Sequence, residues 1–141
     1  MRTPTGFLFP MKNPNNAFEK PPLSIAAQLE QLSSRGVIIQ DKVMTSWLHA
    51  LTYLCNLCAH HSKLWNRNFT LKPLIANGYK QQLKNNRSFS AQAAILKIFL
   101  DVISPGSGWA KHLRVLISDH PNIVVNRMGF SNDWQSDAFW H

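Results

Sequence analysis

Residues 41–65 have the sequence DKVMTSWLHALTYLCNLCAHHSKLW, and this stretch decides the fold. Apolar side chains recur in it at helical spacing over about six turns, and Asp41 can cap its N-terminus. The apolar positions are Val43, Trp47, Ala50, Leu51, Leu54, Leu57, Cys58, Leu64 and Trp65. The pattern predicts a long helix with one face in a core.

Three shorter helices are predicted around this one. The first spans residues 23–35, is entered through Pro22 and ends at Gly36. The next follows a Ser90 cap, spans residues 91–103 and ends at Ser104-Pro105-Gly106. The last spans residues 108–120, before Pro121. Its apolar side consists of Trp109, Leu113, Leu116 and Ile117.

The remaining segments favour an all-α fold in one domain. Residues 37–39 form a short linker or strand-like run, residues 124–125 are irregular, and no strand has a partner with a hairpin turn. The first 22 residues hold five of the eight prolines, which predicts a flexible arm over residues 1–22. A helical domain is expected over residues 23–141, with a Trp-rich irregular tail.

Positive charge is concentrated in one part of the chain. The net charge is +8, and residues 61–100 contain seven basic residues and no acid. A nucleic-acid strand laid along this segment would release counterions, so RNA is a plausible partner. A solvated face on a small protein is an equally weighted alternative. The candidate RNA-binding residues are Lys63, Arg67, Lys72, Lys80, Lys84 and Arg87.

The two cysteines and the apolar segments indicate the compartment. Cys55 and Cys58 are the only cysteines, no secretory signal precedes them, and no segment has the length of a membrane span. We therefore expect a cytoplasmic protein in a reducing environment, with no membrane partner.

Two adjacent histidines are predicted to point in different directions. Asn56 and His60 are four residues apart and share the polar face of the predicted helix, with His49 and Lys63 nearby. His61 is in line with the apolar positions, which predicts a buried, hydrogen-bonded imidazole. His60 can serve in proton transfer, although a lone exposed histidine is more often an ordinary surface residue.

A zinc or redox centre is not expected from Cys55, Cys58, His60 and His61. One continuous helix cannot direct all four side chains at a tetrahedral metal, and no second cysteine pair exists. A reactive Cys-x-x-Cys pair also needs a helix N-terminus to activate its thiol. We therefore predict no cofactor and a small buried side chain at Cys58.

The five tryptophans allow two interpretations. They could stack on unpaired bases, or they could belong to the core. Trp47 and Trp65 lie on the apolar stripe, which favours the core. Residues 128–130 and Trp134 are expected to clamp the tail onto the helices, with a tight turn at Gly129.

Two blocks of sequence resemble a known family. Residues 46–67, SWLHALTYLCNLCAHHSKLWNR, look like the signature of the Abi (AbiD/AbiF-like) abortive-infection family of bacterial phage-defence proteins. Residues 122–134, NIVVNRMGFSNDW, together with Trp140, look like the C-terminal block of that family. The resemblance runs from about residue 23 to the C-terminus. Because family members are usually longer, the chain resembles a C-terminal portion or a shortened member.

The resemblance implies a HEPN-type helical bundle and a ribonuclease motif. That motif has an Arg, a polar residue after it, and a His five positions after the Arg. Two copies form a metal-free site where a 2′-hydroxyl attacks its neighbouring phosphate. Here Asn56 and His60 match the motif, whereas Cys55 stands at the Arg position. A Cys supplies no permanent charge, so we expect a weakened endoribonuclease. Lys63 and Arg67 are poorly placed substitutes.

These observations leave several hypotheses. The chain is expected to be a phage-defence protein that binds single-stranded RNA and carries a degenerate endoribonuclease site. The alternatives are a catalytically inactive RNA-binding or dimerisation module, and a truncated remnant of a longer protein. The resemblance also implies a homodimer. Whether an antitoxin, or a separately encoded N-terminal half, is a further partner stays open.

Overall fold

The computed structural model describes residues 23–36 and 40–141. Its four α-helices are α1 (Ile25–Ser34), α2 (Asp41–Ala59), α3 (Phe89–Ile103) and α4 (Trp109–Ser118). Four short 3₁₀ turns complete it: η1 (Asn77–Tyr79), η2 (Val125–Met128), η3 (Trp134–Ser136) and η4 (Ala138–Trp140). No strand occurs in these two ranges, which confirms the all-α prediction. The predicted arm and the 37–39 run lie outside them.

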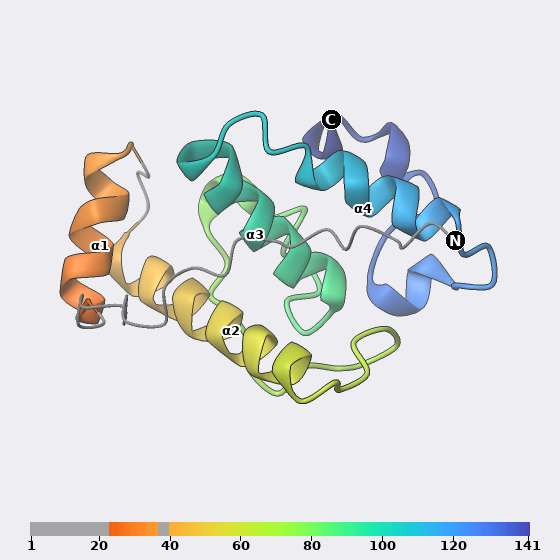
Figure 1. Ribbon diagram of the computed structural model, residues 1–141, viewed down its shortest axis with the longest axis horizontal. Helices are drawn as coiled ribbons and strands as arrows, with labels where there is room; N and C mark the ends of the chain where they lie inside the picture. Colours follow the sequence, from red (N-terminus) through yellow and green to blue (C-terminus); the bar gives the residue numbers. More distant parts are fainter. Residues whose placement is uncertain (1–22, 37–39) are drawn as a thin grey trace, which may run out of the picture.

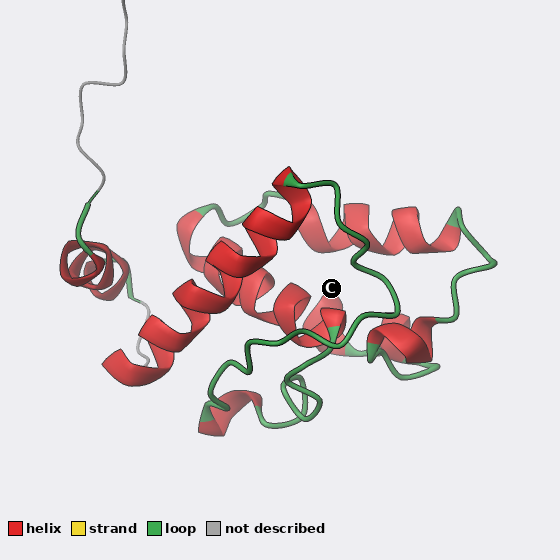
Figure 2. Cartoon of the chain, turned by 90° about the horizontal axis from the view of Figure 1, so that it is seen from below, coloured by secondary structure: helices red, strands yellow, loops and turns green. Residues whose placement is uncertain are grey.

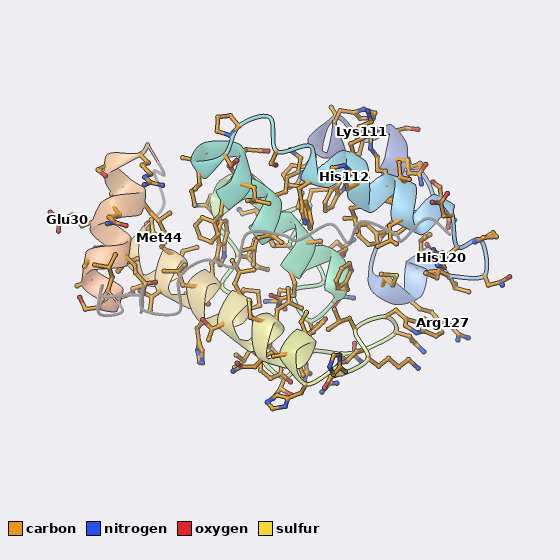
Figure 3. All side chains as sticks on the ribbon, in the orientation of Figure 1. Glu30, Met44, Lys111, His112, His120 and Arg127 are labelled. Atoms are coloured by element: carbon orange, nitrogen blue, oxygen red, sulfur yellow. The ribbon has the colours of Figure 1, made fainter. Side chains whose placement is uncertain are left out.

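Helix α3 is the centre of the bundle. It lies between α2 and α4, and α1 stands at one end beside the start of α2 (Figure 1). Trp47 of α2 is completely buried and makes edge-on contacts with Tyr79 and Phe99, at ring-centroid distances of 5.9 and 6.0 Å. Met44 is buried near the junction of α1 and α2, whereas Glu30 points away from α1 (Figure 3). The core prediction for Trp47 is confirmed.

The helix starts differ from the prediction by one or two residues. Gln40 is the N-cap of α2, and Asp41 is its first helical residue. Ser88, and not Ser90, caps α3, since its side chain accepts a hydrogen bond from the amide of Ala91. Two serines near one helix start both satisfy the capping preference, and the structure uses the earlier one.

A long irregular segment, residues 60–88, joins α2 to α3, and we call it the α2–α3 connection. It turns back toward the end of the molecule where α2 begins (Figure 2). Two hydrogen bonds hold it there. The indole of Trp47 donates to the Leu74 carbonyl at 2.8 Å, and the Leu74 amide donates to the Ser46 hydroxyl at 2.9 Å. The predicted breaks at Pro73 and Asn77-Gly78 lie within this segment.

The C-terminal tail packs onto α3 with its aromatic residues. Phe130, Trp134 and Trp140 are buried and contact one another, with ring centroids 4.4 to 5.6 Å apart. Gly129 has φ of +88°, and a Cβ there would collide with the Ser88 side chain. The predicted clamp and tight turn are confirmed. Leu116 was wrongly assigned to the apolar side of α4, because it is exposed.

Candidate functional site

The segment expected to carry the chemistry lies where α2 ends. Helix α2 stops at Ala59, and His60 is its C-cap. The His61 amide donates to the Cys58 carbonyl and the Ser62 amide donates to the Leu57 carbonyl, at 3.0 and 2.8 Å. This pair of bonds is the Schellman motif, which usually has glycine at the left-handed position. Here His61 occupies it, with φ of +50°.

Three burial predictions for this segment are wrong, and the early helix end explains two of them, those for His61 and Trp65. His61, Cys58 and Trp65 are all exposed, Trp65 by 40%. The sequence pattern suggested a longer helix because Leu64 continues the helical spacing of apolar residues past Ala59. Leu64 does pack against the cluster of Leu54, Leu57 and Phe69, but it belongs to the irregular connection. The left-handed turn at His61 redirects the chain, so Trp65 no longer follows the apolar stripe.

One face of α2 presents a row of polar and aromatic side chains. Tyr53, Asn56 and His60 are separated by three and four residues, so they follow one another along the helix surface. His49 precedes them by four residues on the same face. Asn56 and His60 are exposed and Tyr53 is half-buried. The predicted pairing of Asn56 with His60 on one face is compatible with this helix, since the His60 amide still donates to the Asn56 carbonyl.

Tyr53 is a member of this row that the sequence analysis missed. Hydrogen bonding to Thr70 lowers the pKa of the Tyr53 hydroxyl, and desolvation opposes that shift. A hydrogen bond to Arg67 and its positive charge lower the pKa further. The ring also packs edge-on against Phe69 at 6.4 Å. The available signal was the spacing of Tyr53 from Asn56 and His60.

Arg67 therefore lies against α2 and not away from it. Its guanidinium also donates to the Lys63 carbonyl at 3.5 Å, and the side chain is half-buried. From the sequence, Arg67 was expected beyond the helix, as a poorly placed substitute for the motif Arg. The connection folds back, however, and brings this cation beside Tyr53, two helical turns before His60.

Cys55 lies beside this row on the exposed surface of α2. Both Cys55 and Cys58 are free thiols. Among the described residues, no three His, Cys, Asp or Glu side chains gather where they could hold a metal ion. The side chains of Cys55, Asn56 and His60 form no hydrogen bond to another residue of the described ranges. The site is open, and a ligand could reach it from solvent.

The six candidate RNA-binding residues lie along the α2–α3 connection. Lys63, Lys72, Lys80, Lys84 and Arg87 are exposed, and Arg67 is half-buried. Arg87 also shapes the connection, because its Nε donates to the Phe69 carbonyl at 3.1 Å, and its own carbonyl accepts from the Phe69 amide at 2.8 Å. Lys97 differs: it is buried on α3 and bonded to Asp101 at 2.7 Å.

An aromatic side chain accompanies these charges. The exposed ring of Trp65 lies under the ammonium group of Lys63, 4.5 Å from the ring centroid. Cation–π pairs of this kind hold a surface indole in place at small cost. The connection thus combines cations with an exposed flat ring, which is the composition of surfaces that hold single-stranded nucleic acid.

The comparison with protein families supports the first of the two resemblance blocks, residues 46–67. The family model described as Abi-like protein matches residues 6–66, a range that includes α1, α2 and the His60 region. Residues 6–66 are therefore similar to the Abi-like family, and the match supports a protein of the abortive-infection type. The match begins within the predicted arm and does not extend to the block at residues 122–134.

No curated protein and no solved structure matches the chain. Within the described ranges, no helix combines the length and apolar character needed to cross a membrane.

Proposed function

We propose that this Abi-like protein binds single-stranded RNA along the α2–α3 connection. The observation that carries the proposal is the exposed Trp65 within an acid-free segment that bears six basic residues. Its lysines can contact phosphates as the strand passes, and the Trp65 ring can stack on a base. A merely solvated face does not require an exposed indole, so the combination favours nucleic acid over the alternative.

The test is retention of a labelled single-stranded RNA at several salt concentrations. Replacing Lys63, Lys72 and Lys80 with Gln removes three exposed charges from the connection. The slope of log affinity against log salt should fall by about two, since each single-strand phosphate contact contributes about 0.7.

A matched control removes the same charge elsewhere. Lys42, Lys111 and Arg127 are exposed and lie outside the connection. Lys111 is on α4 and Arg127 is in η2 (Figure 3). Changing these three to Gln should leave most of the slope intact. An equal loss in both triple variants would show only a general attraction to net positive charge.

RNA cleavage is a second candidate, favoured by the row Tyr53, Asn56 and His60 with Arg67 beside it. In a HEPN-type site built from two copies of the chain, His60 would move a proton as a 2′-hydroxyl attacks its phosphate. The leaving 5′-oxygen would take a proton in turn. Arg67 would add positive charge to this surface, but it lies two helical turns from His60, so the motif Arg that Cys55 replaces would still be missing.

Cleavage of labelled RNA in EDTA tests this second candidate with three proteins: the native chain, Cys55→Arg, and Cys55→Arg with His60→Ala. We expect Cys55→Arg to cut about 10²–10³ times faster than the native chain, by analogy with the loss of one charge-stabilising donor. The added His60→Ala should abolish cutting. Absence of cutting in all three would reject the ribonuclease and leave RNA binding alone.

A further inference from the structure

A pocket of about 590 Å³ lies between the α2–α3 connection and the C-terminal tail. Its volume is within the range of small-molecule sites. Lys84 and the amide side chains near it line one side, and Phe130, Trp134 and Trp140 of the tail line the other. The pocket therefore joins the basic segment to the aromatic tail, which are more than forty residues apart in sequence.

One side of the pocket is aromatic and rigid. Phe130, Trp134 and Trp140 are held by contacts with one another, and only a small part of each ring faces the opening. Gly129 allows the tail to approach the start of α3, where a side chain would collide with Ser88. These contacts fix the pocket before any ligand enters, which lowers the entropic cost of binding.

The opposite side is polar and basic. Gln81, Gln82 and Asn85 offer amide groups that donate and accept hydrogen bonds, and Lys84 is an exposed cation. Ser90 belongs to the first turn of α3, whose N-terminal end favours an anion. Asp137 is the one acid in the lining, and its Oδ1 already accepts from the Phe139 amide at 2.9 Å.

We infer that this pocket holds a single unpaired nucleotide. The base would lie against the aromatic side with its edge at the amide groups, and the phosphate would lie at Lys84, away from Asp137. This inference deepens the proposed RNA binding and rests on it, since the pocket opens on the same basic connection. Inorganic phosphate alone would leave the aromatic side unused, and an apolar ligand would leave Lys84 and the amides unpaired.

Calorimetry with the four ribonucleoside 5′-monophosphates, ribose 5-phosphate and inorganic phosphate tests the inference on the full chain. At least one nucleotide should bind about tenfold tighter than ribose 5-phosphate. Lys84→Ala should weaken that binding about tenfold, whereas Lys111→Ala, on α4, should change it less than twofold.

A pocket-filling pair of variants provides an independent check. Ser131 and Ser136 are both exposed, and only Ser131 lines the pocket. Ser131→Trp should abolish nucleotide binding, and Ser136→Trp should not. The helical circular dichroism of both variants should match the native chain.

Each outcome separates the inference from the proposed function. Equal binding of all phosphates, or nucleotide binding that both serine variants retain, would overturn the pocket assignment. If the native chain binds no nucleotide but still retains RNA, the pocket assignment is overturned and the proposed RNA binding along the connection stands. Nucleotide binding with no salt-dependent RNA retention would support the pocket and reject the proposed function.

Discussion

The hydroxyl group of Tyr53 meets two side chains that come from the α2–α3 connection, those of Thr70 and Arg67. Both contacts favour the ionised phenolate, so the pKa is lower than the ordinary value of 10.0. Because the pKa of Tyr53 is lowered in the folded state, its ionisation stabilises the protein fully above pH 10. This stabilisation is lost as the pH falls through the folded-state pKa. At neutral pH this contribution is therefore absent.

Titration of tyrosinate absorbance measures this environment directly. The chain has two tyrosines, so Tyr79→Phe leaves Tyr53 as the only reporter. Thr70→Val should raise the titration midpoint toward 10, and Arg67→Met should raise it by less. A midpoint that neither change moves would mean that the connection does not hold Arg67 and Thr70 against α2.

The residue-scale predictions succeeded where a side chain's place follows from its own element. Asn56 and His60 share one helical surface because they are four residues apart along α2. The contact between Tyr53 and Arg67 was not predicted, because it depends on how the α2–α3 connection folds back onto α2. No local sequence pattern specifies that path.

The end of α2 is an element whose geometry conflicts with its sequence. His61 adopts φ of +50°, where a side chain is disfavoured and glycine is preferred. His61→Gly should stabilise the fold by about 0.5–1 kcal/mol, since relief of the left-handed conformation exceeds the added backbone entropy of glycine.

The neighbouring residue supplies the control. His60 has φ of −91°, so His60→Gly relieves no strain and should cost about 0.5–1 kcal/mol. Urea denaturation of both variants measures the two effects, which are opposite in sign. Equal destabilisation would show that His61 is not held in the left-handed region.

Helices were predictable from spacing, and their ends were predictable wherever a proline or glycine follows closely. Proline and glycine marked the ends of α1, α3 and α4 closely. No such residue follows Ala59, and the apolar spacing of Leu64 continued the pattern, so the prediction extended α2 too far. The predicted burial of His61 and Trp65 was wrong for that reason, whereas Cys58 lies within α2 and is exposed on its surface.

At the scale of the whole molecule, one glycine, Gly129, allows the C-terminal tail to pack closely against the start of α3. A Cβ at residue 129 would lie 2.6 Å from the Ser90 hydroxyl and would also collide with Ser88. Ser88 cannot simply move, because its hydroxyl bonds to the Asn85 carbonyl at 2.6 Å and caps α3.

Gly129→Ala should therefore destabilise the protein by more than about 2 kcal/mol, because it combines overpacking with a strained backbone. Gly78→Ala is the matched control, since nothing lies within 4 Å of a Cβ there, and it should stay within about 0.5 kcal/mol. Thermal unfolding compares the two. A similar melting temperature for both would mean that the tail packs loosely on α3.

Buried side chains such as Phe69 and Leu83 anchor the α2–α3 connection in the core, and hydrogen bonds to its backbone fix the path between them. The carbonyls of Phe69, Pro73 and Leu74 accept the bonds that fix its course, from Arg87, Asn86 and Trp47. Most of its exposed side chains take no part in these contacts. Mutation can therefore change the chemistry displayed there without changing the path of the chain, so related proteins that keep these anchoring donors could diverge in what they recognise while retaining one scaffold.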